Sequence, residues 1–157
     1  MPRRKKVYDK NRTPDTRHNS MLVSRTIQMV MWNGKKSIAQ RLVYDAMDEV
    51  AAKTKKPALE AYEEAIKNVS PLVELKARRI GGANYQVPIE VKSDRAVTLA
   101  LRWLIDAARA RSGQSFAKSF AQELVDAINM TGTAMKKKED THRMAEANKA
   151  FAYLARY

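Results

Sequence analysis

The chain is 157 residues long and strongly basic, with 30 Lys and Arg residues against 17 Asp and Glu residues and a formal net charge of +13. Its length suits one domain, and its hydrophobic fraction of 45% is enough to form a core. The absence of Cys excludes disulfides, thiolate metal sites and cysteine nucleophiles. No stretch approaches the length of a membrane-spanning helix. A charge surplus of this size indicates a polyanionic partner, and its spread over several segments favours nucleic acid over an anionic membrane.

Residues 1–19 are polar, contain two prolines and show no apolar periodicity. This composition predicts a basic tail that is disordered in the free protein and folds on a partner, followed by a helical domain over residues 20–157. The candidate partner contacts in the tail are Arg3, Arg4, Lys5, Lys6 and Lys10.

Apolar spacing predicts three helices before residue 71, over about 20–32, 37–53 and 57–69. A Ser-Ile-Ala-Gln capping box is expected to open the second helix, and a proline opens the third. Lys35 and Lys36 lie where the second helix begins, and their charges suit a phosphate group at that helix start.

Residues 78–91, RRIGGANYQVPIEV, provide the one convincing pair of strands in a sequence that otherwise reads as helices. The Gly-Gly pair predicts a hairpin turn, since glycine adopts positive φ without a Cβ clash. The apolar residues on both sides of the turn have odd numbers, so placing them on one face requires a three-residue loop over 81–83. This register pairs Ala77 with Val87.

The hairpin, an arm spanning about 72–91, combines basic and aromatic side chains near its tip. The predicted register sets Arg79 opposite Tyr85 and leaves Lys76 and Arg78 on the other face. Two interpretations fit these residues equally well: a structural hairpin with solvating arginines, and a nucleic-acid finger with Tyr85 free to stack on a base.

Three further helices are predicted over about 93–109, over 115–129 and from 133 onward. Apolar residues go most of the way around the first of them, which predicts a central helix with Trp103 buried in the core. The last helix is expected to bury one stripe, formed by Met144, Ala147, Phe151 and Leu154.

Arginines of the helix after the arm, Arg95, Arg102 and Arg109, recur every seven residues and share a helix face. With Arg111 and the arginines of the arm they predict one continuous basic surface. For the basic groups of the last helix, a solvated helix face and a functional cluster are expected about equally. These groups are Lys136, Lys137, Lys138 and Arg143.

Together the segments predict a mainly α fold: a single six-helix domain with a protruding two-stranded β-hairpin arm and a basic N-terminal tail. The two His residues lie far apart, and neither HExxH nor a serine elbow occurs, so we expect no enzyme, metal or cofactor. Cations spread over a tail, helix starts and a hairpin fit a folded RNA better than DNA, which one recognition helix usually reads. The alternatives are a DNA-binding architectural or regulatory protein and an RNA-modifying enzyme.

Three separated segments, RRIGGANYQVPIEV, ALRWLIDAAR and KKKEDTHRMAEANKAFA, closely resemble the universal small-subunit ribosomal protein seven family in its bacterial form. The opening MPRR and the segment NGKKS match as well, so the resemblance covers essentially the whole chain. Asn84 and Ala77 depart from the residues that the family pattern carries there. The resemblance implies a structural protein that binds the 3′ domain of small-subunit rRNA, starts assembly of the head and has a helical domain with an extended β-arm.

The resemblance also implies partners. The basic residues named above would contact rRNA, and the tip of the arm would lie near the exit-site tRNA and the mRNA path. Neighbouring small-subunit ribosomal proteins are expected as partners, and neither a homo-oligomer nor a membrane is. The expected location is the ribosome in the cytoplasm, with the plastid stroma as an alternative. The tip residues nearest tRNA are Gly81, Gly82, Ala83, Asn84 and Tyr85.

Overall fold

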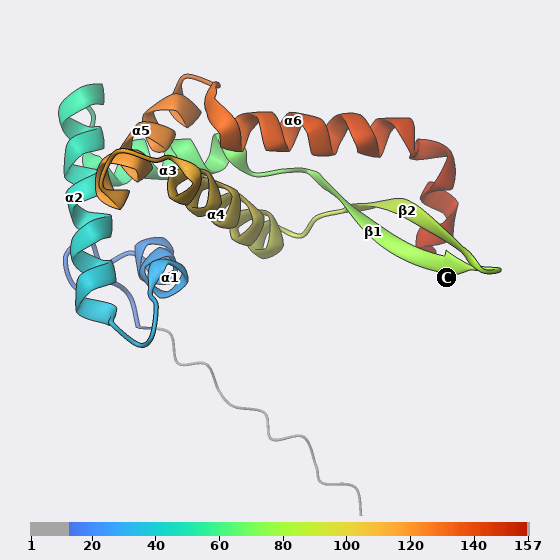
Figure 1. Cartoon of the computed structure of the whole chain (residues 1–157), viewed down its shortest axis with the longest axis horizontal. Coiled ribbons are helices and arrows are strands. Elements are labelled where there is room, and N and C mark those ends of the chain that lie inside the picture. The colour runs from blue at the N-terminus through green and yellow to red at the C-terminus, as the bar shows by residue number, and fades with distance from the viewer. Residues whose placement is uncertain (1–12, 157) are drawn as a thin grey trace, which may run out of the picture.

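The computed structural model describes residues 13–156 and has the expected architecture, a helical body from which an antiparallel hairpin projects (Figure 1). The predicted helix positions are confirmed to within a few residues up to the last helix. The elements are α1 (Met21–Val30), α2 (Lys36–Thr54), α3 (Ala58–Val69), β1 (Val73–Ile80), β2 (Ala83–Glu90), α4 (Ser93–Ala110), α5 (Phe116–Ile128), α6 (Gly132–Ala147) and the 3₁₀ helix η1 (Lys149–Arg156).

The core of the body forms where α5 packs against α2, α3 and α4. Its largest fully buried side chains include Tyr62 of α3 and Phe120 of α5. The predicted burial of Trp103 is wrong, because this side chain is only partly buried at the edge of the core, beside the start of α6. The buried face of α4 carries Leu101, Leu104 and Ile105 together with small alanines, and Trp103 lies beside this face.

The register of the arm differs from the predicted one. Gly81 and Gly82, both with positive φ, form a two-residue turn, so Ala77 pairs with Gln86 and Lys76 pairs with Val87. The prediction assumed that the apolar residues of both strands share one face. In the structure they lie on opposite faces, and Val87 is the one strand residue of the arm that is fully buried.

The last predicted helix is divided in two in the structure. α6 ends at Ala147, and η1 then turns onto β2, so the ribbon is braced along one face (Figure 1). Phe151 of η1 packs on Tyr85, with 5.3 Å between ring centroids. The predicted stripe on one continuous last helix is therefore wrong, since Met144 is exposed and the contacts of Phe151 come from η1.

Part of the predicted tail also belongs to the body. Residues 13–20 form a turn against α2, in which Asp15 is buried and accepts hydrogen bonds from the Tyr44 hydroxyl at 2.6 Å and from the backbone N–H groups of Arg17 and His18 at 3.1 Å. The guanidinium of Arg17 makes two hydrogen bonds, at 2.9 and 3.0 Å, with the carboxylate of Asp48. Residues 15–18, which the sequence analysis placed in the tail, therefore contact the helical body.

Candidate nucleic-acid interface

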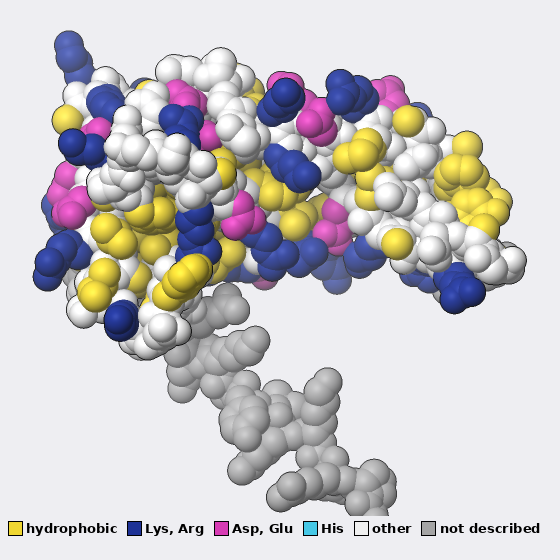
Figure 2. Space-filling model, in the orientation of Figure 1, with side chains coloured by type: hydrophobic (Ala, Val, Ile, Leu, Met, Phe, Trp, Pro, Cys, Tyr) yellow, Lys and Arg dark blue, Asp and Glu magenta, His cyan; other side chains and the backbone are white. Residues whose placement is uncertain are grey.

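Lysines and arginines line the lower margin of the face in Figure 2, below α4 and the base of the arm, and reappear near the arm tip. Exposed hydrophobic side chains lie in the region of α1, α2 and α5 on the same face. The five basic residues predicted as contacts in the tail, Arg3, Arg4, Lys5, Lys6 and Lys10, lie outside the described residues. The candidate interface is therefore built from four groups: the start of α2, one face of α4, the arm and the start of α6.

The first group lies where α2 begins. Asn33 and Gly34 both have positive φ and turn the chain, after which Lys35 occupies the N-cap and Lys36 opens the helix. No side chain caps the helix start, so the predicted capping box at Ser37 is wrong. Two exposed lysines beside uncapped backbone N–H groups, at the positive end of the helix dipole, form an arrangement that suits an RNA phosphate.

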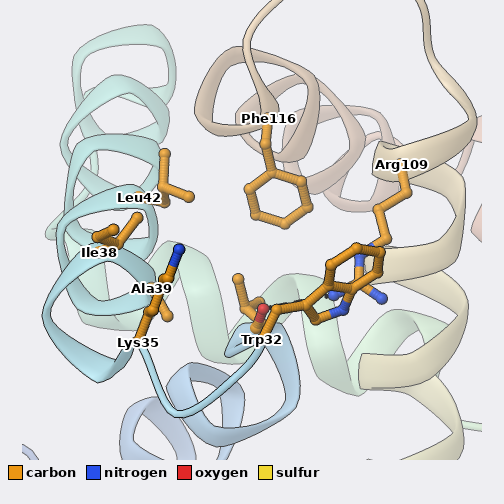
Figure 3. Close-up of a pocket in the computed structure, with 8 residues that line it drawn as sticks. Trp32, Lys35, Ile38, Ala39, Leu42, Arg109 and Phe116 are labelled. Atoms are coloured by element: carbon orange, nitrogen blue, oxygen red, sulfur yellow. Dashed lines mark hydrogen bonds between the residues drawn. The ribbon is translucent and has the colours of Figure 1, made fainter.

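Next to this helix start lies a hollow of about 450 Å³. Ile38 and Leu42 of α2 line one side, Phe116 of α5 points in, and Trp32 with Arg109 closes the other side (Figure 3). The sequence pattern did not indicate this site, because Trp32 falls at the end of the first predicted helix and Phe116 lies far from it in the chain. The signal that could have found it is an aromatic residue directly before the basic NGKKS segment.

The two aromatic rings of the hollow, Trp32 and Phe116, each pack against another side chain of the body. The Arg109 guanidinium lies 5.2 Å from the centre of the Trp32 ring, and its Nη2 donates to the carbonyl oxygen of Val30 at 3.4 Å. The ring of Phe116 stacks on Phe120, with 5.6 Å between centroids and 11° between planes. Both rings are therefore positioned by the body before any ligand arrives.

The second group is the row of arginines on α4. Arg95, Arg102 and Arg109 are all exposed, as the seven-residue spacing predicted. Arg95 also reaches the base of the arm, where its Nε donates to Glu74 Oε2 at 3.0 Å. The row therefore connects the hollow near α1 with the arm.

Arg111, predicted as part of the same basic surface, has a different position. Its Nη2 lies 2.6 Å from Asp126 Oδ2 and 3.3 Å from Oε1 of Glu123, whose carboxylate is fully buried. The hydrogen bond with Asp126 raises the pKa of Arg111 above its ordinary value. Glu123 also accepts a hydrogen bond from the N–H of Thr133 at 3.2 Å, so this ion cluster joins α4, α5 and the start of α6. The charge of Arg111 is used inside the body.

The third group is the arm. Arg79 is exposed opposite Asn84, and Arg78 is half-buried opposite Tyr85, which reverses the predicted placement of the two arginines. Because Tyr85 packs on Phe151, its ring is partly covered, unlike the free stacking surface of the nucleic-acid interpretation. Lys76 is exposed, 3.6 Å from Glu74, and the turn residues 81–84 are all exposed at the tip.

The fourth group opens α6. Lys136 and Lys137 are exposed, and they line a second hollow with Trp103 and two aspartates. Lys138 points inward and donates to the carbonyl oxygen of Asn68, near the end of α3. Arg143 is exposed and pairs with Asp140 at 2.6 Å.

Near the Lys138 contact, His142 of α6 binds the backbone at the base of the arm. Nε2 of His142 accepts a hydrogen bond from the N–H of Leu72 at 3.1 Å. Burial lowers the pKa of His142, and the charge of Lys138 lowers it further, so the neutral ring that accepts this bond is favoured. Of the three consecutive lysines, two are available to a partner and one stabilises the junction of α3, α6 and the arm.

Within residues 13–156, no group of three or more His, Asp or Glu side chains could hold a metal ion. Over the same part of the chain, no helix is both long and apolar enough to span a membrane.

Comparison with known proteins identifies the family of the chain. The family model described as ribosomal protein S7p/S5e matches residues 2–149. The small ribosomal subunit protein uS7 of Chloroflexus aggregans is 56% identical over 156 residues, covering 99% of each chain. Its counterpart in Thermosipho melanesiensis is 57% identical over 151 residues, which cover 96% of this chain and 97% of the relative. The protein of the same name in Arthrospira platensis is 55% identical over 153 residues, covering 98% of each.

Both the extent of the family match and the level of identity confirm the resemblance that the three sequence segments indicated. The chain belongs to the ribosomal protein S7p/S5e family.

Proposed function

We propose that this protein is a structural, non-enzymatic component of the small ribosomal subunit that binds rRNA and organises its 3′, or head, domain. The observation that carries the proposal is the family match over residues 2–149 of a chain with a net charge of +13. A ribosomal protein acts where the ribosome is, which is the cytoplasm in a bacterial cell; the plastid stroma stays a prediction. The family match lends no support to the alternative of a DNA-binding regulator.

The distribution of charge supports a one-sided rRNA contact. Carboxylates of α2 and α3 lie on the outside of the body, and several of them pair with cations of their own surroundings. Lys53 lies 2.8 Å from Glu49, and Lys56 lies 2.6 Å from Glu64. These pairs reduce the attraction of that side for a polyanion, so the RNA would lie on the side of the α4 arginines and the arm.

Within this interface we assign rRNA contacts to the exposed cations of the four groups and, following the family resemblance, to the basic residues of the tail. Arg111 and Lys138 contribute to the fold instead, because their charges are engaged by groups of the body. We further propose that the arm tip over 81–85 faces the exit-site tRNA and the mRNA path. Other small-subunit proteins are the protein partners, and the chain acts as one copy.

The test is the salt dependence of binding to a 3′-domain fragment of small-subunit rRNA. With roughly six to ten phosphate contacts, log K against log salt should have a slope of about −4 to −9. Duplex DNA of equal length serves as the control and should bind more weakly at physiological salt. A slope near zero, or equal affinity for the duplex, would contradict the proposal.

A further inference from the structure

The hollow between α1, α2, α4 and α5 combines exposed apolar side chains with cations. Trp32 is 69% exposed and Ile38 is 52% exposed, although both are large apolar side chains. Two aromatic rings and two cations border it, and no Asp or Glu lines it. Large exposed apolar groups in one concave place mark a binding surface.

We propose that this hollow binds one unpaired nucleotide of the rRNA, with the base against the Trp32 ring and the adjoining phosphate held by Lys35 and Arg109. This inference rests on the proposed rRNA-binding function and specifies a contact within it. Stacking on an aromatic side chain and a cation on the backbone are the two interactions that single-stranded RNA makes with proteins.

The charge of the lining selects this occupant over an apolar peptide segment. The hollow at the base of the arm includes Glu90 and Glu146, and the hollow beside Trp103 includes Asp106 and Asp140. Those carboxylates would repel a phosphate. The hollow at Trp32 has only Lys35 and Arg109 as charged members of its lining, so its charge is complementary to a nucleotide.

The geometry leaves room for a base to enter. The guanidinium of Arg109 covers Trp32 from one side, while most of the indole surface remains open to solvent. Phe116 points into the hollow from α5, and the side chain of Lys35 reaches up from the start of α2 (Figure 3). A volume of about 450 Å³ lies within the range of roughly 300–1,000 Å³ that small-molecule pockets have.

The lining also predicts how selective the site is. Apart from the Lys35 and Arg109 side chains and the indole N–H of Trp32, its side chains are apolar, so few groups can hydrogen-bond to the edges of a base. The site should therefore accept any of the four bases in an unpaired position. It should reject a nucleotide held in a duplex, because a stacked and paired base cannot enter the hollow.

The decisive measurement compares Trp32→Ala and Trp32→Phe in the full chain, binding to the same 3′-domain rRNA fragment. Trp32→Ala should weaken binding by roughly 5- to 150-fold, the range for loss of one base–aromatic stack, with an unchanged salt slope. Trp32→Phe should recover most of the affinity. Lys35→Gln should instead reduce the magnitude of the slope by about 1. Tyr153→Ala is the matched control, because Tyr153 of η1 is an aromatic residue that is 65% exposed outside the four groups, and it should bind like the parent.

A second readout follows the indole itself. In a Trp103→Phe chain the remaining tryptophan is Trp32, and its fluorescence should be quenched when rRNA binds. Chemical probing should find one base that the parent protects and Trp32→Ala leaves reactive. If the parent binds rRNA with a steep salt slope while Trp32→Ala binds equally well and no quenching occurs, the nucleotide pocket is refuted and the function stands. If the parent itself shows no salt-dependent binding, the proposed function fails.

Discussion

In the helical body, several cations lie close to carboxylates or carbonyl groups of neighbouring elements. The outer half of the arm, residues 76–87, contains no Asp or Glu. Arg111 lies between Asp126 and the buried Glu123. Arg79, on the arm, projects into solvent opposite an asparagine. The same residue type therefore stabilises the fold in one region and stays available to a polyanion in the other, and tertiary surroundings distinguish the two roles.

The two regions also differ in what holds them together. The body has a core of fully buried side chains from α1 to α6, whereas the arm is a two-stranded ribbon whose one covered face rests on α6 and η1. A two-stranded ribbon alone is marginally stable in water. Substitutions in the body should therefore act mainly on global stability, and substitutions on the arm should act on RNA binding or on local order.

The largest effect is expected in the core. Phe120→Ala should lower the free energy of unfolding by about 3–5 kcal/mol, because the ring is fully buried. Trp103→Ala should cost about 1–2 kcal/mol, since part of its indole is already exposed. Urea unfolding followed by circular dichroism measures both. Equal losses for the two variants would show that Trp103 is a core residue after all.

The ion cluster of the body tests whether Arg111 belongs to the fold. Arg111→Met should cost about 3 kcal/mol, because it leaves the buried carboxylate of Glu123 without its cation. The slope of rRNA affinity against salt should stay the same. Arg102→Met is the matched control: it should leave stability within about 0.5 kcal/mol and reduce the magnitude of the slope by about 1. The opposite pattern would make Arg111 an RNA contact.

On the arm, Arg79→Ala should leave the melting temperature nearly unchanged and weaken rRNA binding by roughly 1.5–3 kcal/mol, the value of a hydrogen bond to a charged group. Arg78→Ala is a less clean test, because Arg78 is half-buried and its loss also alters the packing of the ribbon. Titration of both variants with rRNA at physiological salt gives the comparison. Parent-like affinity of Arg79→Ala would mean that the arm contacts tRNA or a neighbouring protein rather than rRNA.

The brace between the arm and the C-terminal helix can be removed alone. Phe151→Ala should destabilise the arm by about 1 kcal/mol, the scale of one aromatic pair, and should leave the unfolding of the body almost unchanged. Amide hydrogen exchange should speed up in β2 and not in α5. Faster exchange in both would show that arm and body unfold together.

The smallest effect concerns the turn at residues 13–20. Burial alone would raise the pKa of Asp15, but hydrogen bonds from the Tyr44 hydroxyl and from the N–H groups of His18 and Arg17 outweigh it, so the pKa lies below its ordinary value of 3.8. The ionised carboxylate therefore stabilises the fold above about pH 4, and this contribution is lost as the pH falls through the folded-state pKa. Tyr44→Phe should cost below about 1 kcal/mol at pH 7, and this cost should shrink as the pH falls through the folded-state pKa of Asp15. A cost that stays constant with pH would contradict this.

Most of the body could be predicted from its sequence because helix formation and burial follow local spacing. Apolar residues at helical intervals and breakers such as Asn33-Gly34 located five helices to within a few residues. The resemblance of three segments then identified the family. The exposed cations of the interface followed from the same helix geometry, as the seven-residue row on α4 illustrates.

Contacts between distant segments could not be predicted in this way. The arm packs against α6 and η1, which lie more than 40 residues further along the chain, and the carboxylates that engage Arg111 come from the next helix. The Trp32 hollow needs residues from α1, α2, α4 and α5 at once.

Local spacing in the sequence by itself determined the helices, the presence of a hairpin and the excess of positive charge, because each depends on residues close together in the chain. Only the tertiary structure decided which cations remain available, which face of the ribbon is buried and where an aromatic hollow opens. These features depend on side chains that folding brings together from distant positions, and the free energy of such contacts leaves no periodic signal in the sequence.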